Sequence, residues 1–141
     1  MGPLVVGFTG TRMGMALAQF FAVADLLDHL KPVEAHHGGC VGADAAFHRM
    51  CESRHIVTVV HWSDMPRYRA LIHGDVECVP LPPLERNHHI VEDSDVLIAA
   101  PKEAREITRS GTWATWRWAT KTGKPSYIVR PSGTVVSHGA E

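Results

Sequence analysis

With 141 residues, the chain is long enough to form one domain with its own core, and no apolar run approaches the roughly 20 residues that a membrane-spanning helix needs. Its 14 Lys and Arg and 15 Asp and Glu give a formal net charge of −1, which argues against the broad basic surface of a non-specific nucleic-acid binder. Three widely spaced cysteines and the absence of a basic, apolar leader predict a cytoplasmic protein with free thiols.

Short apolar runs that are rich in β-branched residues alternate along the chain with longer amphipathic segments. Strands are expected at 4–9, 33–37, 56–62, 95–100 and 125–129, with at most a short one at 77–79, and helices at 15–30, 43–54, 84–92 and 111–123. This alternation predicts an α/β, Rossmann-like, three-layer α/β/α fold with a mostly parallel sheet of about five strands. We expect a single domain over 1–131 and a disordered C-terminal tail over 132–141.

The first strand ends in Thr9-Gly10-Thr11-Arg12, a turn of small residues that carries one positive charge and leads into a long helix. Backbone N–H groups, two hydroxyls and a guanidinium that can hold an oxyanion in bidentate fashion suit a phosphate at this point. The alternative is a tight connection with a solvated arginine. The motifs G-x-G-x-x-G and G-K-S/T are absent, which disfavours dinucleotide hydride chemistry and ATP hydrolysis.

A second glycine-rich turn follows the second expected strand, at 37–44. Gly38 and Gly39 would let a ligand approach the backbone closely. Asp44 either caps the following helix or accepts hydrogen bonds from a ribose or a base. Because the carboxyl ends of parallel strands meet at one edge of a sheet, we expect this turn to lie beside the first one.

The last expected helix begins with Ser110-Gly111-Thr112, whose hydroxyls and free N–H groups also suit a phosphate. The alternative is a helix N-cap with no other role. Arg86 and Asn87 begin the preceding helix, and they are candidate partners for an anion and for a base or ribose. Here the alternative is the charged first turn of a surface helix.

Ten histidines raise the question of a metal, yet the spacings H-x-x-x-H, H-E-x-x-H and C-x-x-C are absent, so we predict no metal site and no cofactor. His36 and His37 alternate in a strand, so at most one of them can face the ligand. Trp116 and Trp118 point about 200° apart on a helix. Trp118 is therefore expected to face either the interface of a homodimer or higher homo-oligomer, or a covering loop.

Several of these segments, taken in order, resemble the SLOG superfamily of Rossmann-like proteins, which includes the Lonely Guy phosphoribohydrolases, DprA and small stand-alone YspA-like members. The segments are GFTGTR at 7–12, HGGCVGAD at 37–44, RN at 86–87, DVLIAAP at 95–101 and SGTWAT at 110–115. The chain looks most similar to the YspA-like members. The resemblance implies a nucleotide or a ribose-phosphate ligand at the carboxyl ends of the strands. Because no apolar run is long enough to span a bilayer, we expect no membrane association.

One position departs from the Lonely Guy pattern, because Thr115 stands where P-G-G-x-G-T-x-x-E places its glutamate. A neutral threonine cannot do the work of a carboxylate in cleaving an N-glycosidic bond. Glu103 or Glu106 in the preceding loop, or Asp44, would have to act as the catalytic carboxylate. We therefore expect binding of a phosphorylated nucleoside or nucleotide-derived ligand, with nucleoside 5′-monophosphate hydrolysis as the alternative and DprA-like binding of single-stranded DNA as a second alternative that the charge balance disfavours.

Overall fold

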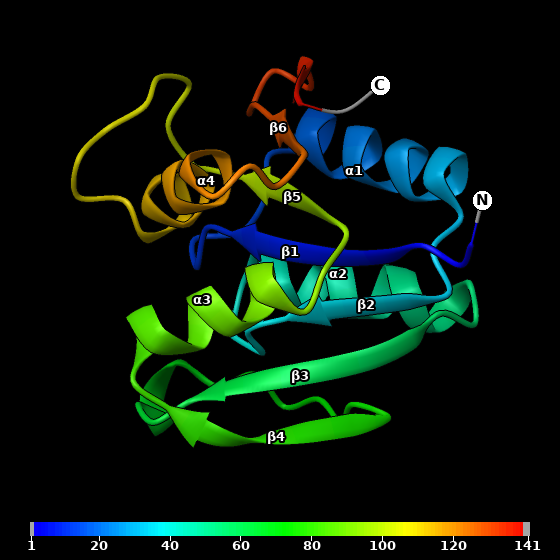
Figure 1. The fold of residues 1–141 in the computed structure, drawn as a ribbon, viewed down its shortest axis with the longest axis vertical. Coiled ribbons are helices and arrows are strands. Elements are labelled where there is room, and N and C mark those ends of the chain that lie inside the picture. The colour runs from blue at the N-terminus through cyan, green and yellow to red at the C-terminus, as the bar shows by residue number, and fades with distance from the viewer. Residues whose placement is uncertain (1, 140–141) are drawn as a thin grey trace.

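A computed structural model describes residues 2–139 and contains one sheet flanked by helices (Figure 1). The strands are β1 (Val5–Gly10), β2 (Glu34–His37), β3 (Val57–Ser63), β4 (Val76–Leu81), β5 (Val96–Ala100), β6 (Ser126–Val129) and β7 (Val135–His138). The helices are α1 (Leu17–Leu30), α2 (Ala43–Ser53), α3 (Pro83–Glu92) and α4 (Gly111–Lys121), with a short 3-10 helix at Pro66–Tyr68. Between residues 2 and 139, no helix is both long and apolar enough to cross a lipid bilayer.

The strand order in the sheet is β4-β3-β2-β1-β5-β6-β7, and every neighbouring pair is parallel except β6 and β7. The predicted α/β class with a mostly parallel sheet is confirmed, although the sheet has seven strands where about five were expected. One reason is β4, which is longer than the short strand expected at 77–79. Its exposed edge position tolerates Pro80, which cannot donate to a sheet.

The other additional strand corrects the prediction of a disordered tail from residue 132. A tight turn, with Gly133 at φ +89, reverses the chain after β6, and β7 then pairs antiparallel with β6. All four residues of β7 are exposed, so the strand lacks the burial alternation by which strands are recognised in a sequence. The tail prediction also covered residues 140–141, which lie outside the described residues.

Helices cover both faces of the sheet, with α1 and α2 on one face and α3 and α4 on the other (Figure 1). The larger core lies under α1 and α2, where the rings of Phe8 and Phe47 stack with centroids 4.2 Å apart. The smaller core joins Ile90 of α3 to Leu97 of β5. Burying a phenylalanine in such a core contributes about 1.5–3 kcal/mol, so these contacts hold both layers of helices against the sheet.

Strand β1 lies at the point where the order of the strands reverses. The chain runs outward from β1 through β2, β3 and β4 on one side, and β5 and β6 follow on the other side. Ligands of open parallel sheets bind in the crevice at the carboxyl ends of the strands at such a switch point. The turns that follow β1, β2 and β5 are therefore the place to look for a site.

Candidate functional site

A cleft of about 840 Å³ lies at the carboxyl ends of β1, β2 and β5. It is bordered by the turns after these strands and by the first turns of α3 and α4. Twelve residues that the sequence places at the ligand site line it: Thr9, Gly10, Thr11, Arg12, Gly38, Asp44, Arg86, Asn87, Glu103, Ser110, Gly111 and Thr112. Three loops far apart in the sequence thus meet around one cavity.

The turn after β1 is fixed to its two neighbours by backbone hydrogen bonds. The N–H of Thr11 donates to the carbonyl of Ala100 at 3.1 Å, and the N–H of Ala43 donates to the carbonyl of Thr11 at 2.9 Å. Gly10 has no room for a side chain, since a Cβ there would lie 2.5 Å from the Cβ of Ala43. The start of α2 therefore packs directly on this turn, and Thr11, Arg12 and Met13 line the cleft, with Arg12 as the charged residue of the three.

The guanidinium of Arg12 lies over the ring of Tyr68, with Cζ 3.8 Å from the ring centroid. This contact holds an exposed cation at the mouth of the cleft without burying its charge. Hydrogen bonding to Arg12 lowers the pKa of Tyr68. Arg12 is therefore oriented and still able to bind an incoming anion.

Arg86 is buried in the floor of the cleft, where most of its N–H groups are already used. Nη1 donates to the carbonyls of Gly38 at 2.7 Å and His61 at 3.1 Å, and Nε donates to Oδ1 of Asn87 at 2.7 Å. Gly38 is required beneath it, because a Cβ there would lie 2.6 Å from Nη1. Arg86 thus joins the ends of β2 and β3, and its Nη2 is the group best placed to meet a ligand. The nearest hydrogen-bond partner of Nη2 is the sulfur of Cys40 at 3.9 Å.

Asp44 is buried beside this arginine, with a side chain only partly satisfied. Oδ2 accepts the N–H of Cys40 at 3.2 Å, whereas Oδ1 is buried and has no hydrogen-bond partner within residues 2–139. Burial raises the pKa of Asp44 to about 6, although the positive charge of Arg86 opposes the shift. The N-cap of α2 is Gly42, and no side chain caps it, so Asp44 is left to serve the turn and the cleft.

The start of α4 has the predicted arrangement, with Ser110 as the N-cap. Its Oγ accepts the N–H of Trp113 at 3.2 Å, and the N–H groups of Gly111 and Thr112 have no partner inside the helix. Thr115 does not line the cleft. Its hydroxyl donates to the carbonyl of Gly111 at 2.8 Å and it is buried, so the position of the Lonely Guy glutamate carries no acid.

The lining of the cleft contains more positive than negative side chains. Among the described residues, its lining holds four cationic side chains and two carboxylates. Lys102 and Arg109 come from the loop before α4 and were not singled out from the sequence. Glu103 comes from the same loop, and its Oε1 is buried without a partner among the residues described. Asp44 and Glu103, the two candidate catalytic carboxylates that line the cleft, therefore each have an unpaired buried oxygen.

Two residues considered from the sequence lie outside the cleft. Gly39 has φ +67, and a Cβ there would collide with the ring of Trp62 at 2.6 Å, so it shapes the turn and does not line the cavity. His37 lies on the face of β2 opposite to His36, where its Nε2 lies 2.9 Å from Nδ1 of the buried His48.

Trp118 is half-buried and stacks on His88 of α3, with ring centroids 4.0 Å apart.

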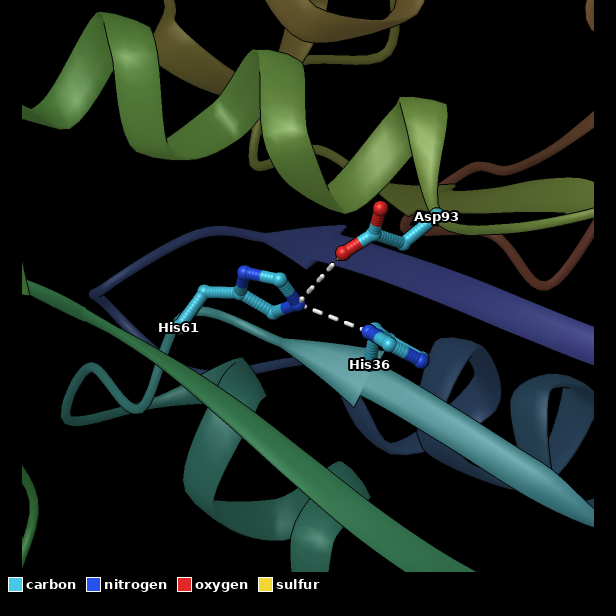
Figure 2. Close-up of side chains that lie close together, drawn as sticks. All are labelled: His36, His61 and Asp93. Atoms are coloured by element: carbon cyan, nitrogen blue, oxygen red, sulfur yellow. Dashed lines mark hydrogen bonds and ion pairs between the residues drawn. The ribbon is translucent and has the colours of Figure 1, made fainter. Parts of the chain in front are cut away.

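A separate polar cluster joins His36 of β2, His61 of β3 and Asp93 at the end of α3 (Figure 2). Nδ1 of His36 lies 2.7 Å from Nε2 of His61, which in turn lies 3.8 Å from Oδ2 of Asp93. Glu34 holds the other nitrogen of His36 at 2.6 Å. Burial lowers the pKa of His61 to about 4. No sequence pattern indicates this cluster, because its members come from three separate elements and have no motif spacing.

No protein-family model and no curated protein sequence matches the chain. Three solved structures share its fold. The molybdenum cofactor binding protein from the phototrophic bacterium Rippkaea orientalis superimposes with a TM-score of 0.71 at 19% identity, over 92% of this chain and 78% of that one. The molybdenum cofactor carrier protein from Chlamydomonas reinhardtii gives a TM-score of 0.67 at 19% identity, over 90% and 76%.

The third structure is TM1055, a structural-genomics target, with a TM-score of 0.63 at 14% identity over 87% of this chain and 72% of that one. Identities of 14–19% establish a common fold. The ligand of this chain therefore has to be inferred from the residues of the cleft. The chain thus shares a Rossmann-like α/β fold with molybdenum cofactor binding and carrier proteins.

Proposed function

We propose that the cleft binds a phosphorylated heterocyclic small molecule, with a phosphorylated nucleoside as the leading candidate. The observation that carries this proposal is the meeting of the α4 N-terminus, the Arg12 turn and the Gly38 turn around one cavity that has an excess of cationic side chains. Helix N-termini and arginine favour phosphate, and a volume of about 840 Å³ lies in the range of small-molecule sites. The order of the motifs and the shared fold both support a SLOG-type assignment.

In this proposal the two sides of the cleft have different tasks. Arg12, with the N–H and hydroxyl groups of Ser110-Gly111-Thr112, binds the phosphate. Gly38, Asp44 and the Arg86-Asn87 pair line the side that receives the sugar or base. The unpaired Oδ1 of Asp44 needs a hydrogen-bond donor, and a ribose hydroxyl or a ring N–H supplies one.

Two of the structural neighbours are named for the molybdenum cofactor, which is therefore a specific candidate for this ligand. The molybdenum cofactor is itself a phosphorylated heterocycle, a pterin, so the same phosphate-binding groups suit it. Binding without turnover is the simpler function of the cleft, because Thr115 replaces the acidic residue of the hydrolases.

Hydrolysis of a nucleoside 5′-monophosphate is the second candidate. It is favoured by the unpaired buried oxygens of Asp44 and Glu103 and by the pKa of about 6 at Asp44, which suits proton transfer near neutral pH. Release of free base from AMP that is lost in both Asp44→Asn and Glu103→Gln would establish it. No turnover across a panel of nucleoside monophosphates would leave binding as the function.

Calorimetric titration with AMP tests the binding site, with Arg12→Ala as the variant and Arg67→Ala as its matched control. Both arginines stack on Tyr68, but Arg67 does not line the cleft. We expect Arg12→Ala to weaken AMP binding at least tenfold, because one charge-assisted contact is worth about 1.5–3 kcal/mol, and Arg67→Ala to leave it unchanged. Equal affinities in the two variants would refute the assigned phosphate position.

The mass of any small molecule released from the purified protein distinguishes the two ligands. A ribose phosphate supports the nucleotide proposal, whereas a pterin together with molybdenum supports the cofactor. A protein that carries neither molecule and binds neither AMP nor the molybdenum cofactor would refute the proposed function.

A further inference from the structure

We propose that His36, His61 and Asp93 form a binding site for a divalent transition metal of the Zn²⁺ type, at a place separate from the ligand cleft. One nitrogen of each imidazole and one carboxylate oxygen lie within 4.8 Å of one another (Figure 2). Two nitrogens and one oxygen form a donor set that zinc accepts, whereas Mg²⁺ and Ca²⁺ prefer oxygen alone.

The proton arrangement at His36 already fits a metal ligand. The ionised carboxylate of Glu34 can only accept, so it fixes the proton of a neutral His36 ring on Nε2, at 2.6 Å. The lone pair is then on Nδ1, which points at Nε2 of His61 at 2.7 Å. A carboxylate that holds the non-ligating nitrogen is the usual second partner of a metal-binding histidine. Glu34 is accordingly a positioning residue for this site.

The distances require only small movements to accept an ion. With Zn–N and Zn–O bonds of about 2.0–2.1 Å and tetrahedral angles, donor atoms lie about 3.3 Å apart. The two histidine nitrogens, now 2.7 Å apart, would have to separate slightly, and Asp93, now 3.8 Å from His61, would have to approach slightly. Asp93 is half exposed, so its side chain has room to move.

The position of the cluster also suits binding of an ion from solution. The histidines are buried on two neighbouring strands, which fixes their rings, while Asp93 opens the site to solvent at the end of α3. Three protein ligands leave the fourth tetrahedral position to water. In the free site the proton between the two rings is the single N–H proton of a neutral His61, carried on Nε2. On metal binding this proton moves to Nδ1 of the same ring, so the ring stays neutral and the freed lone pair of Nε2 binds the metal.

The test is titration of the chelator-treated full chain with Zn²⁺ against a chromophoric chelator, and with Co²⁺ as a spectroscopic probe. We expect one strongly bound equivalent of Zn²⁺ per chain and visible Co²⁺ bands typical of tetrahedral coordination. His61→Gln should weaken Zn²⁺ binding about 100-fold or more, and Glu34→Gln about 10–100-fold. Asp93→Asn, at an exposed position, checks the ligand set without risk to the core.

His73→Gln is the matched control, since His73 is fully exposed and pairs with Glu77 away from the cluster. It should leave the single strong equivalent intact. The proposal is overturned if the wild-type chain binds Zn²⁺ no more tightly than Asp93→Asn and His61→Gln, or if His73→Gln weakens binding as much as they do. Because no nucleotide is present, failure here leaves the proposed function of the cleft unaffected.

Discussion

Replacing Asp44 with asparagine should change how the stability of the protein depends on pH. Asp44 is 5% exposed, and burial raises its pKa from 3.8 to about 6. The folded protein therefore holds a proton that the unfolded chain releases between pH 4 and pH 6. Above pH 6 the ionised carboxylate is buried, and the shift corresponds to about 3 kcal/mol of lost stability at neutral pH.

The Asp44→Asn chain cannot incur this cost. Below pH 4 the wild-type carboxyl is protonated in both states, so it contributes no pH dependence there. We expect the free energy of unfolding of Asp44→Asn, minus that of the wild type, to rise by about 3 kcal/mol between pH 4 and pH 7. Urea unfolding of both chains at several pH values measures this difference. The lowered pKa values of His37 and His61 make stability rise with pH, which is the opposite of the effect of Asp44. Both histidines are present in both chains, so their contributions cancel in the difference.

Asp28→Asn is a control of opposite sign. Its hydrogen bond with Arg54 lowers the pKa of Asp28, so this carboxylate stabilises the fold at neutral pH and the benefit is lost as the pH falls. The corresponding difference for Asp28→Asn should therefore fall as the pH rises toward 4 and stay nearly constant between pH 5 and pH 7. A difference for Asp44→Asn that stays constant, or that falls in the same way, would refute the account of the buried carboxylate.

Four further substitutions, one of them a control, test other parts of the structure by urea unfolding at pH 7. Arg86→Met removes the cation from two buried carbonyls and a buried carboxylate and should cost about 3–5 kcal/mol; a loss below about 1 kcal/mol would contradict the described network. Gly38→Ala places a Cβ 2.6 Å from that arginine and should cost about 1–3 kcal/mol, whereas Gly111→Ala meets open space and should cost nothing; equal losses would contradict the packing. Phe47→Ala removes the ring stacked on Phe8 and should cost about 3–5 kcal/mol.

The layers of the fold could be predicted because their signals are local. Strand β5 is buried on both faces and reads as an unbroken apolar run, and α1 carries a helical apolar stripe. Strand β7 could not be found in this way. Its stability comes from pairing with β6, and pairing between exposed residues leaves no hydrophobic pattern in a sequence.

The same distinction explains what was predicted of the site. Gly10, Gly38 and Ser110 were placed in one cleft because the carboxyl ends of parallel strands meet at one edge, a rule that needs only the element order. The direction of a side chain in a turn is not set by that rule, so Gly39 was placed in the cleft although it faces Trp62. The cluster of His36, His61 and Asp93 depends on strand register and on where α3 ends, which no spacing encodes.

His61 contributes to both the histidine–aspartate cluster and the cleft, through different atoms. Its ring contacts His36, while its backbone carbonyl accepts from Arg86 in the floor of the cleft. A displacement of this one residue of β3 is therefore felt in both places. Thermodynamic linkage makes such an effect reciprocal: if an ion at the ring raises the affinity of the cleft for its ligand by some factor, the ligand raises the affinity for the ion by the same factor.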